Sequence, residues 1–304
     1  MENLCGNGSK RDPVPNERQS SESASRIEAL HALETSASSK SRALTEAMRF
    51  SVQVTILDVS GICLAEMPES IGDLKRLTDL KISDNDLNAL PQSICRLKEL
   101  TTLDLQKNRL EELPWAICQC KSLRSINADF NSLTSLPESV GRLTKLARLS
   151  LHFNRLESLP RSMSTMANLV ELDVSFNRLT DIPENVCFIA SLMRLNIASN
   201  FSDLKSLPDS IGRLQKLQEL DVSFNNLTYL PDSLAMLTNL QTLRVEGNPL
   251  YIPPLSLAAQ GKEVILNYMN RHVEKESRKS RMMKGHFWRF LYKMTMQTVA
   301  KRNR

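Results

Sequence analysis

Apolar residues recur along the chain at a fixed interval. A leucine or isoleucine opens each block of the form Leu-x-Leu-x-x-Asn, and the next opener follows 23 residues later in every case but one, where the interval is 25. The openers are Leu57, Leu80, Leu103, Ile126, Leu149, Leu172, Leu195, Leu220 and Leu243. Self-similarity at a period of about 20–50 residues is typical of a solenoid, in which each unit packs only against its neighbours. The pattern therefore predicts nine stacked repeats over residues 51–255.

Each repeat contains the pattern of a short strand and of a turn. Apolar and polar residues alternate in the run Leu172-Asp173-Val174-Ser175, which predicts a strand with Leu172 and Val174 turned inward. A proline such as Pro208 closes each repeat and can begin a short helical turn, because its φ angle suits the first helical position. Stacked repeats would then pair their strands in parallel on one side and place helical turns on the other.

A polar column crosses this apolar pattern. Five residues after every opener but the first stands an asparagine: Asn85, Asn108, Asn131, Asn154, Asn177, Asn200, Asn225 and Asn248. The chain must turn away from the strand here, and an asparagine amide can satisfy backbone groups that the turn leaves unpaired. We therefore expect a structural asparagine ladder along the solenoid. Ile62 takes this place in the first repeat, as expected of an atypical terminal unit.

The 23-residue unit resembles the leucine-rich repeat, over about two-thirds of the chain. The run Leu-Pro-x-Ser-Ile-Gly-x-Leu, found at residues 207–214, is similar to the intracellular Ras-group class, as is the lack of cysteine-rich caps. The resemblance implies an α/β solenoid. It would be a leucine-rich repeat horseshoe of about nine 23-residue repeats, with parallel strands on the concave face and short helical turns on the convex face.

A narrower resemblance is to the plant intracellular Ras-group-related leucine-rich repeat proteins. It is carried by the 25-residue unit at residues 200–208, the block at 220–225 and the ending at 247–254. Gly285–Trp288 matches the Gly-Val-Tyr-Trp motif of that family at only two of four positions. The resemblance implies a non-enzymatic protein that mediates protein interactions in intracellular signal transduction, with a small GTPase or a signalling enzyme among the candidate partners.

The charge of the chain is unevenly distributed. The net charge of +5 at first suggests a polyanionic partner. Residues 271–304 alone carry +9, however, so that residues 1–270 carry −4. The basic character therefore belongs to the C-terminal segment, and we expect no nucleic-acid partner.

The outward positions of the strands form the candidate binding face. The positions one before, one after and three after the openers hold nine acidic and four basic side chains, so that the concave face is acidic. Four residues after the openers runs a phenylalanine column, which either is a packing spine or adds an apolar strip to the binding face. His152, the one histidine among these residues, has the character of an ordinary surface or packing residue. The candidate partner-binding residues are Asp104, Gln106, Asp129, Phe130, His152, Phe153, Asp173, Phe176, Asp221 and Phe224.

The segments outside the repeats differ in composition. Residues 1–25 are polar and predict a disordered tail. Residues 26–50 predict two short amphipathic helices, interrupted at Thr35–Ser41, that cap the solenoid or serve self-association. Residues 256–283 predict a C-terminal capping helix, whose pattern is clearest from Gly261 onward.

Residues 284–304 form a basic aromatic tail. A basic segment with aromatic residues can contact an anionic membrane surface or a calmodulin-like protein, or remain a solvated tail. The candidate residues for such a contact are Phe287, Trp288, Arg289 and Lys293.

The sequence contains no signature of catalysis or of a cofactor. It has no glycine-rich phosphate loop, His-Glu-x-x-His motif, nucleophile elbow or kinase signature. The six cysteines include no Cys-x-x-Cys pair, and we expect small buried thiols rather than a metal site. The N-terminus has no apolar signal segment, and Glu2 excludes myristoylation. We therefore expect an intracellular, cytoplasmic scaffold without cofactor or metal, and as alternatives a regulatory subunit or a membrane-surface adaptor that uses the tail.

Overall fold

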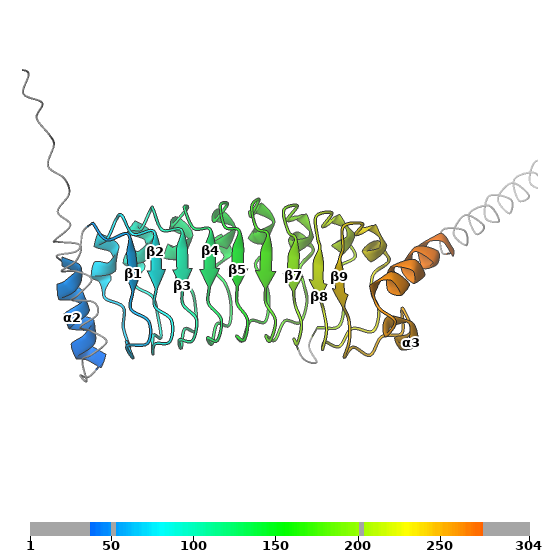
Figure 1. Cartoon of the computed structure of the whole chain (residues 1–304), viewed down its shortest axis with the longest axis horizontal. Helices are drawn as coiled ribbons and strands as arrows, with labels where there is room; N and C mark the ends of the chain where they lie inside the picture. The colour runs from blue at the N-terminus through cyan, green and yellow to red at the C-terminus, as the bar shows by residue number, and fades with distance from the viewer. Residues whose placement is uncertain (1–36, 50–52, 201–203, 276–304) are drawn as a thin grey trace, which may run out of the picture.

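The computed structural model describes residues 37–49, 53–200 and 204–275, which form an elongated solenoid (Figure 1). Nine three-residue strands pair in parallel, in chain order, in one open sheet. They are β1 (Ile56–Asp58), β2 (Asp79–Lys81), β3 (Thr102–Asp104), β4 (Ser125–Asn127), β5 (Arg148–Ser150), β6 (Glu171–Asp173), β7 (Arg194–Asn196), β8 (Glu219–Asp221) and β9 (Thr242–Arg244). The predicted repeat solenoid with nine parallel strands is confirmed.

The interval between openers is also the register of the sheet. Each opener pairs with the opener of the next repeat, and Leu195 pairs with Leu220 although 25 residues separate them. The inward side chains form one continuous core, in which Leu172 and Val174 are fully buried, as predicted. The outward side chains of the nine strands form what we call the sheet face.

Short 3-10 helices cover the side opposite the sheet. They are η1 (Glu69–Asp73), η2 (Gln92–Arg96), η3 (Trp115–Gln119), η4 (Glu138–Arg142), η5 (Arg161–Thr165), η6 (Glu184–Phe188), η7 (Ile211–Arg213) and η8 (Asp232–Met236). A proline precedes every one except η7, so a helical turn follows proline in the 23-residue repeats, as predicted. Each proline is, however, the N-cap residue, with an extended backbone, and does not occupy the first helical position. After the 25-residue interval η7 is shorter, and Ser210 stands before it instead.

The ladder asparagines are buried where the chain leaves each strand. In the middle of the solenoid, the Asn131 amide nitrogen donates to the carbonyl oxygens of Leu105 and Ala128 at 3.0 and 3.1 Å. Its oxygen accepts the backbone N–H of Leu110 at 3.0 Å. Each rung therefore joins its own repeat to the preceding one.

Helix α2 (Ala37–Arg49) packs against the first repeat. Leu44 and Met48 are buried in the common core, and the Lys40 ammonium donates to the carbonyl oxygen of Ile62 at 2.9 Å. Because the helix begins at Ala37, the interruption predicted up to residue 41 is wrong from residue 37 onward. Residues 26–36 lie outside the described part of the chain.

Two helical segments follow the last strand. Helix α3 (Leu255–Ala258) is short, and a second helix covers residues 262–275. Between them Gly261 has a φ of 95°, so the single helix expected from residue 256 is wrong. The later helix buries Ile265 and Met269 completely in the common core. The expected tail at residues 284–304 lies outside the described residues, as do its candidate contact residues.

Candidate functional site

Aspartate and asparagine side chains on the sheet face hold the ends of the strands. In six repeats the residue after the opener accepts the backbone N–H of the residue two positions later, at 2.9–3.2 Å. The pairs include Asp104 with Gln106, Asp173 with Ser175, and Asn196 with Ala198. These carboxylates therefore have a structural task that an asparagine performs equally well, and this was not predicted from the sequence.

Asp129 supplies the same bond to a neighbouring repeat. The residue after the fifth opener is Ser150, and the N–H of His152 donates to the Asp129 carboxylate at 2.8 Å instead. The Ser150 hydroxyl donates to the same oxygen at 2.6 Å. Burial raises the pKa of Asp129 above its usual range, and these two hydrogen bonds oppose that shift.

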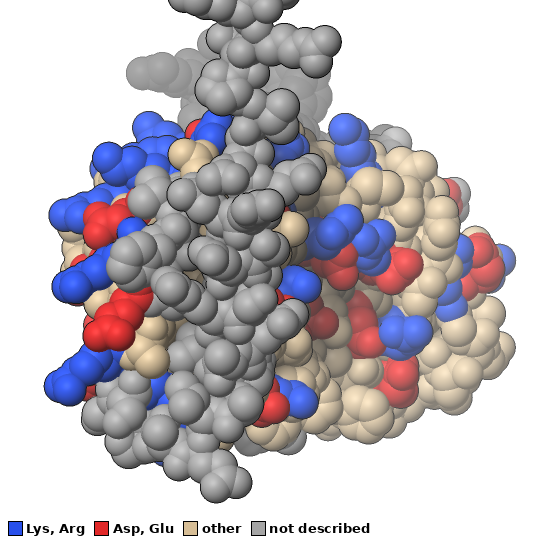
Figure 2. Space-filling model, turned by 60° about the vertical axis from the view of Figure 1, so that its left-hand side comes forward, with Lys and Arg blue, Asp and Glu red and all other residues tan. Residues whose placement is uncertain are grey.

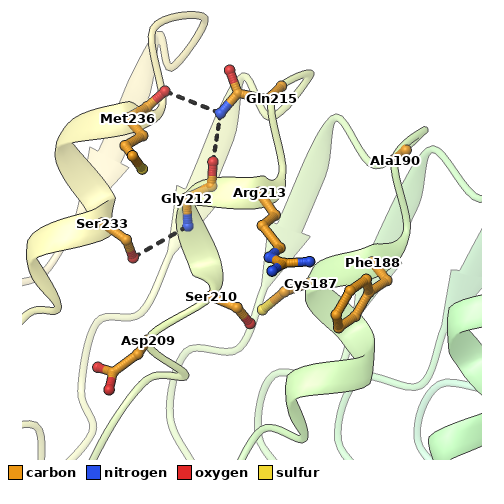
Figure 3. A pocket seen from close by; sticks show the side chains of 10 residues that line it. All are labelled: Cys187, Phe188, Ala190, Asp209, Ser210, Gly212, Arg213, Gln215, Ser233 and Met236. Carbon is orange, nitrogen blue, oxygen red and sulfur yellow. Dashed lines mark hydrogen bonds between the residues drawn. The ribbon is translucent and has the colours of Figure 1, made fainter.

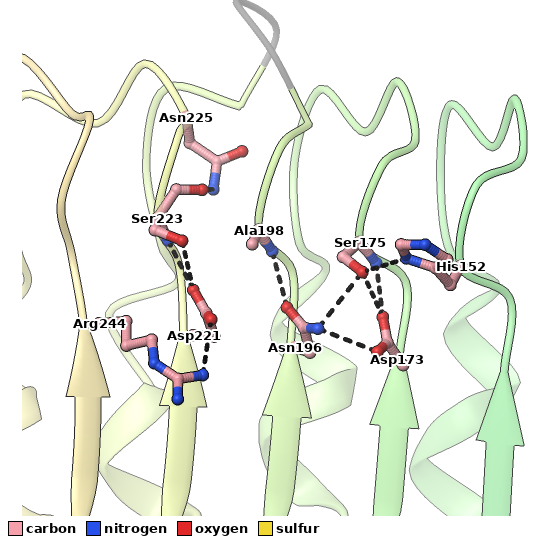
Figure 4. A network of polar contacts seen from close by, with 9 residues as sticks. All are labelled: His152, Asp173, Ser175, Asn196, Ala198, Asp221, Ser223, Asn225 and Arg244. Atoms are coloured by element: carbon pink, nitrogen blue, oxygen red, sulfur yellow. Dashed lines mark hydrogen bonds and ion pairs between the residues drawn. The ribbon is translucent and has the colours of Figure 1, made fainter.

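A hydrogen-bonded network joins three repeats at the carboxyl ends of β5, β6 and β7 (Figure 4). His152 Nδ1 lies 2.8 Å from the Ser175 hydroxyl oxygen, and that hydroxyl donates to Asp173 at 2.6 Å. The second Asp173 oxygen accepts from the Asn196 amide at 2.9 Å. Because every carboxylate oxygen of Asp173 has a partner, this part of the face is already ordered before any ligand binds.

Ion pairs join several of the acidic and basic side chains of the sheet face. Arg194 bonds Glu171 at 2.7 Å, and Arg148 lies 3.9 Å from the same carboxylate. In the eighth repeat, Asp221 accepts from Arg244 at 3.2 Å. Figure 2 shows acidic and basic side chains interspersed rather than segregated. The sheet face is thus a mixed polar surface with an acidic excess.

The phenylalanine column has an unusual backbone. Phe130, Phe153, Phe176 and Phe224 have φ angles of 53–55°, in the left-handed region that costs a residue with a Cβ about 1–2 kcal/mol. Their side chains stay 39–58% exposed. Gly247 occupies the same position in the last repeat, and a Cβ added there would lie 2.5 Å from the Phe224 ring.

Three of the rings form a stack with His152. The centroids of Phe130 and Phe153 are 5.2 Å apart, and those of Phe153 and Phe176 are 5.9 Å apart, with interplanar angles of 29° and 28°. The imidazole packs edge-on against Phe130 and Phe176 at 5.2 and 5.1 Å. The rings therefore pack on one another and still present an apolar surface, and their role in partner binding stays a prediction. Phe224 belongs to a later repeat, beyond Ser199.

A shallow groove of about 450 Å3 runs beside the three rings. Arg155 and Arg178, two positions after Phe153 and Phe176, line it and are exposed. Neither guanidinium has an ion-pair partner in the described part of the chain, whereas Arg109 in the equivalent position bonds Asp86 at 2.6 Å. These arginines were not predicted as site residues, although their repeat position made them recognisable.

A second hollow, of about 560 Å3, lies on the helical side next to η6 and η7 (Figure 3). Phe188 and Met236 line it with exposed side chains, and the Arg213 guanidinium carbon lies 4.7 Å from the centroid of Phe188. It coincides with the 25-residue interval, where η7 is shortened. That interval was the sequence signal for this hollow, which was not predicted.

Three of the cysteines, Cys118, Cys120 and Cys187, are buried thiols, as expected. Burial raises the pKa of Cys120 to about 12 and that of Cys187 to about 11, which disfavours the reactive thiolate. Cys63, by contrast, is exposed, so the expectation of buried thiols is wrong there. Within the described ranges, no group of three or more His, Cys, Asp or Glu side chains could hold a metal ion. None of the helices described has the length and apolar character that crossing a bilayer requires.

Sequence comparison decides the family. A model of a leucine-rich repeat region matches residues 35–204, more than half of the chain, and a leucine rich repeat model matches residues 190–250. The chain belongs to the leucine-rich repeat family. A comparison with curated proteins found no match.

Solved leucine-rich repeat structures resemble this chain over its repeats. A Leptospira interrogans leucine-rich repeat protein is 34% identical, with a TM-score of 0.58, over 67% of this chain and 58% of that one. A TDR receptor is 30% identical, with a TM-score of 0.63, over 70% of this chain and 37% of that one. The plant peptide hormone receptor RGFR1, solved in complex with RGF2, is 25% identical, with a TM-score of 0.55, over 69% and 38%. The chain spans less than two thirds of each of these relatives.

Proposed function

We propose that this leucine-rich repeat protein is a non-enzymatic scaffold that binds a protein partner through the strip of the sheet face from Asp104 to Phe224. The observation that carries the proposal is the exposed ring column beside a polar network whose side chains are already fixed by hydrogen bonds. A surface ordered before binding loses little conformational entropy on association, and apolar anchors within a polar rim are typical of binding hot spots. The peptide complex of the receptor RGFR1 supports a protein or peptide as the ligand class.

We assign the scaffold to intracellular signal transduction. The support is the resemblance to the plant Ras-group-related proteins, and it makes a small GTPase or a signalling enzyme the first partners to test. A regulatory subunit of such an enzyme would use the same surface.

Charge removal in the strip tests the proposal without disturbing the backbone. Asp173→Asn combined with Asp221→Asn keeps the acceptor for the strand-end N–H, as Asn127 and Asn196 show in the same position. Asp58→Asn is the matched control, because Asp58 makes the same bond to Ser60 in the first repeat. We expect affinity capture with mass spectrometry to lose one set of proteins with the double variant only. Identical protein sets from all three chains would contradict a site in this strip.

A second candidate function is a membrane-surface adaptor. The observation that favours it is the net charge of +9 in residues 271–304, which also hold aromatic side chains. Truncation after residue 275 retains every described residue, so the solenoid stays complete. We expect the full chain, and not the truncated one, to co-sediment with anionic vesicles in low salt. Equal sedimentation of both chains would exclude the tail as the membrane contact.

A further inference from the structure

The fold does not require phenylalanine in the exposed ring column. The equivalent turn position holds Asp84, Lys107, Ser199 and, in the first and last repeats, glycine, all with the same left-handed backbone. The turn therefore keeps the same backbone conformation whether the residue is charged, small or glycine. Bulky rings that remain about half exposed in three successive repeats must have a reason other than the turn itself. We call Phe130, Phe153 and Phe176 the aromatic strip.

The aromatic strip is rigid. Its rings stack on each other at 5.2 and 5.9 Å, and the His152 imidazole supports two of them from the side of the sheet. The Ser175 hydroxyl, 2.8 Å from His152 Nδ1, holds the imidazole in turn. Because these rings are already held in place, binding an apolar side chain on the aromatic strip costs little additional side-chain conformational entropy.

The two edges of the aromatic strip differ in available charge. On the sheet side, Asp129 and Asp173 already accept hydrogen bonds from neighbouring hydroxyl, amide or backbone groups. On the groove side, Arg155 and Arg178 are exposed and have no ion-pair partner among the residues described. The cationic groups available to a ligand's carboxylates therefore lie on the groove side, and guanidinium groups bind carboxylates with two parallel hydrogen bonds.

We propose that the aromatic strip, together with Arg155 and Arg178, binds an acidic segment of a partner protein. Apolar or aromatic side chains of that segment pack on the rings, and its carboxylates bond the two guanidinium groups. The proposal rests on the scaffold function and names the partner chemistry for it. The chain's own residues 284–304 carry six basic and no acidic side chains, so their charge opposes them as the occupant.

Peptide selection tests this chemistry directly. The full chain is immobilised and screened against random peptides displayed on phage, and selected peptides are titrated against variants. We expect enrichment of sequences that combine Asp or Glu with aromatic or aliphatic residues. Phe153→Gly, and Arg155→Gln combined with Arg178→Gln, should each weaken these peptides at least roughly tenfold. Glycine is compatible with the left-handed backbone, so Phe153→Gly removes the ring without new strain.

Trp115→Ala is the control, because Trp115 is a comparably exposed aromatic residue in η3, on the side opposite the sheet and outside the proposed binding surface. It should leave binding unchanged, and circular dichroism melts verify that all variants fold. Selected peptides without acidic residues, or equal binding to the Arg155 and Arg178 variant, would overturn the inference. Tighter binding of a peptide of residues 284–304 to the strip would overturn it too. A further outcome is that the peptide variants leave peptide binding unchanged while the double variant of Asp173 and Asp221 still loses its partner. That outcome would overturn this inference alone and leave the scaffold function standing.

Discussion

Replacing one rung of the asparagine ladder should destabilise the solenoid far more than replacing a surface asparagine of the same repeat. In Asn131→Ala, the carbonyl of Leu105 still accepts from Asn108, and the carbonyl of Ala128 still accepts from Asn154. The N–H of Leu110, however, loses the acceptor it has in the structure. The loss is therefore concentrated on one buried donor.

The expected magnitude follows from these contacts. A buried donor without a partner costs about 1–3 kcal/mol. The two amide N–H groups of Asn131, which the carbonyl oxygens of Leu105, Ala128 and Asp129 share, contribute about 0.5–1.5 kcal/mol each. Asn131→Ala should thus lower the free energy of unfolding by about 2–6 kcal/mol, a large part of the roughly 5–15 kcal/mol typical of a folded protein. Asn127→Ala removes a single, partly exposed bond to Asp129 and should cost about 1 kcal/mol or less.

An aspartate at the same rung adds a dependence on pH. In Asn131→Asp, one oxygen can still accept from Leu110, while the other faces the carbonyl oxygens of Leu105 and Ala128. This environment disfavours the charged form and raises the pKa in the folded state above the unfolded value of about 3.9. The folded chain then binds more protons than the unfolded chain between these two pKa values, so the variant loses stability as pH rises through that window.

Urea denaturation followed by circular dichroism measures both effects. The Asn131→Asp chain should lie closer to wild type at pH 4 than at pH 7.5, and Asn131→Ala should be equally destabilised at both. Equal losses for Asn131→Ala and Asn127→Ala would refute the assignment of a ladder role to the buried amide. A deficit of Asn131→Asp that does not change with pH would refute the electrostatic reasoning.

Three further outcomes follow from single contacts. Gly141→Ala would bring a Cβ to 2.1 Å from the Ser162 carbonyl oxygen, and thermal melts should show a loss of about 1–3 kcal/mol. In the native chain at pH 8, mass spectrometry after iodoacetamide treatment should find Cys63 modified and Cys120 modified only in urea, because burial raises the pKa of Cys120 to about 12. Asp129→Asn should gain stability over wild type as pH rises above about 4, because the folded-state pKa of Asp129 is raised, and urea titrations at pH 3 and 7 that show no difference would contradict this.

The core was predictable because its columns are periodic. Leu172 and Val174 could be assigned to the interior from the alternation in one repeat and its recurrence in eight others. The sequence could not separate the helix interior at residues 37–41 from a break, because serine and alanine are compatible with both. Packing of Leu44 against the first repeat decides this, and it is a tertiary contact without a periodic signal.

The surface was less predictable because the same side chain there can be a binding residue and a hydrogen-bond acceptor for the backbone. From the sequence, Asp173 looks like an acidic residue available for binding. In the structure its carboxylate accepts the backbone N–H of Ser175. Asparagines in the same column were the available signal that an acceptor, rather than a charge, is required. The left-handed backbone at Phe153 had a comparable signal in Gly61 and Gly247, which share its position in the repeat.

The register of the sheet also bears on how such a chain can evolve. Because Leu149 pairs in the same way with Ile126 and with Leu172, duplication or deletion of one whole unit leaves every remaining opener opposite another opener. The interior then needs no compensating mutation, while the outward side chains of each copy can diverge separately. Duplication or deletion in steps of 23 residues can thus lengthen or shorten the binding surface. The 25-residue unit, by contrast, has two additional residues and coincides with the hollow next to η6 and η7.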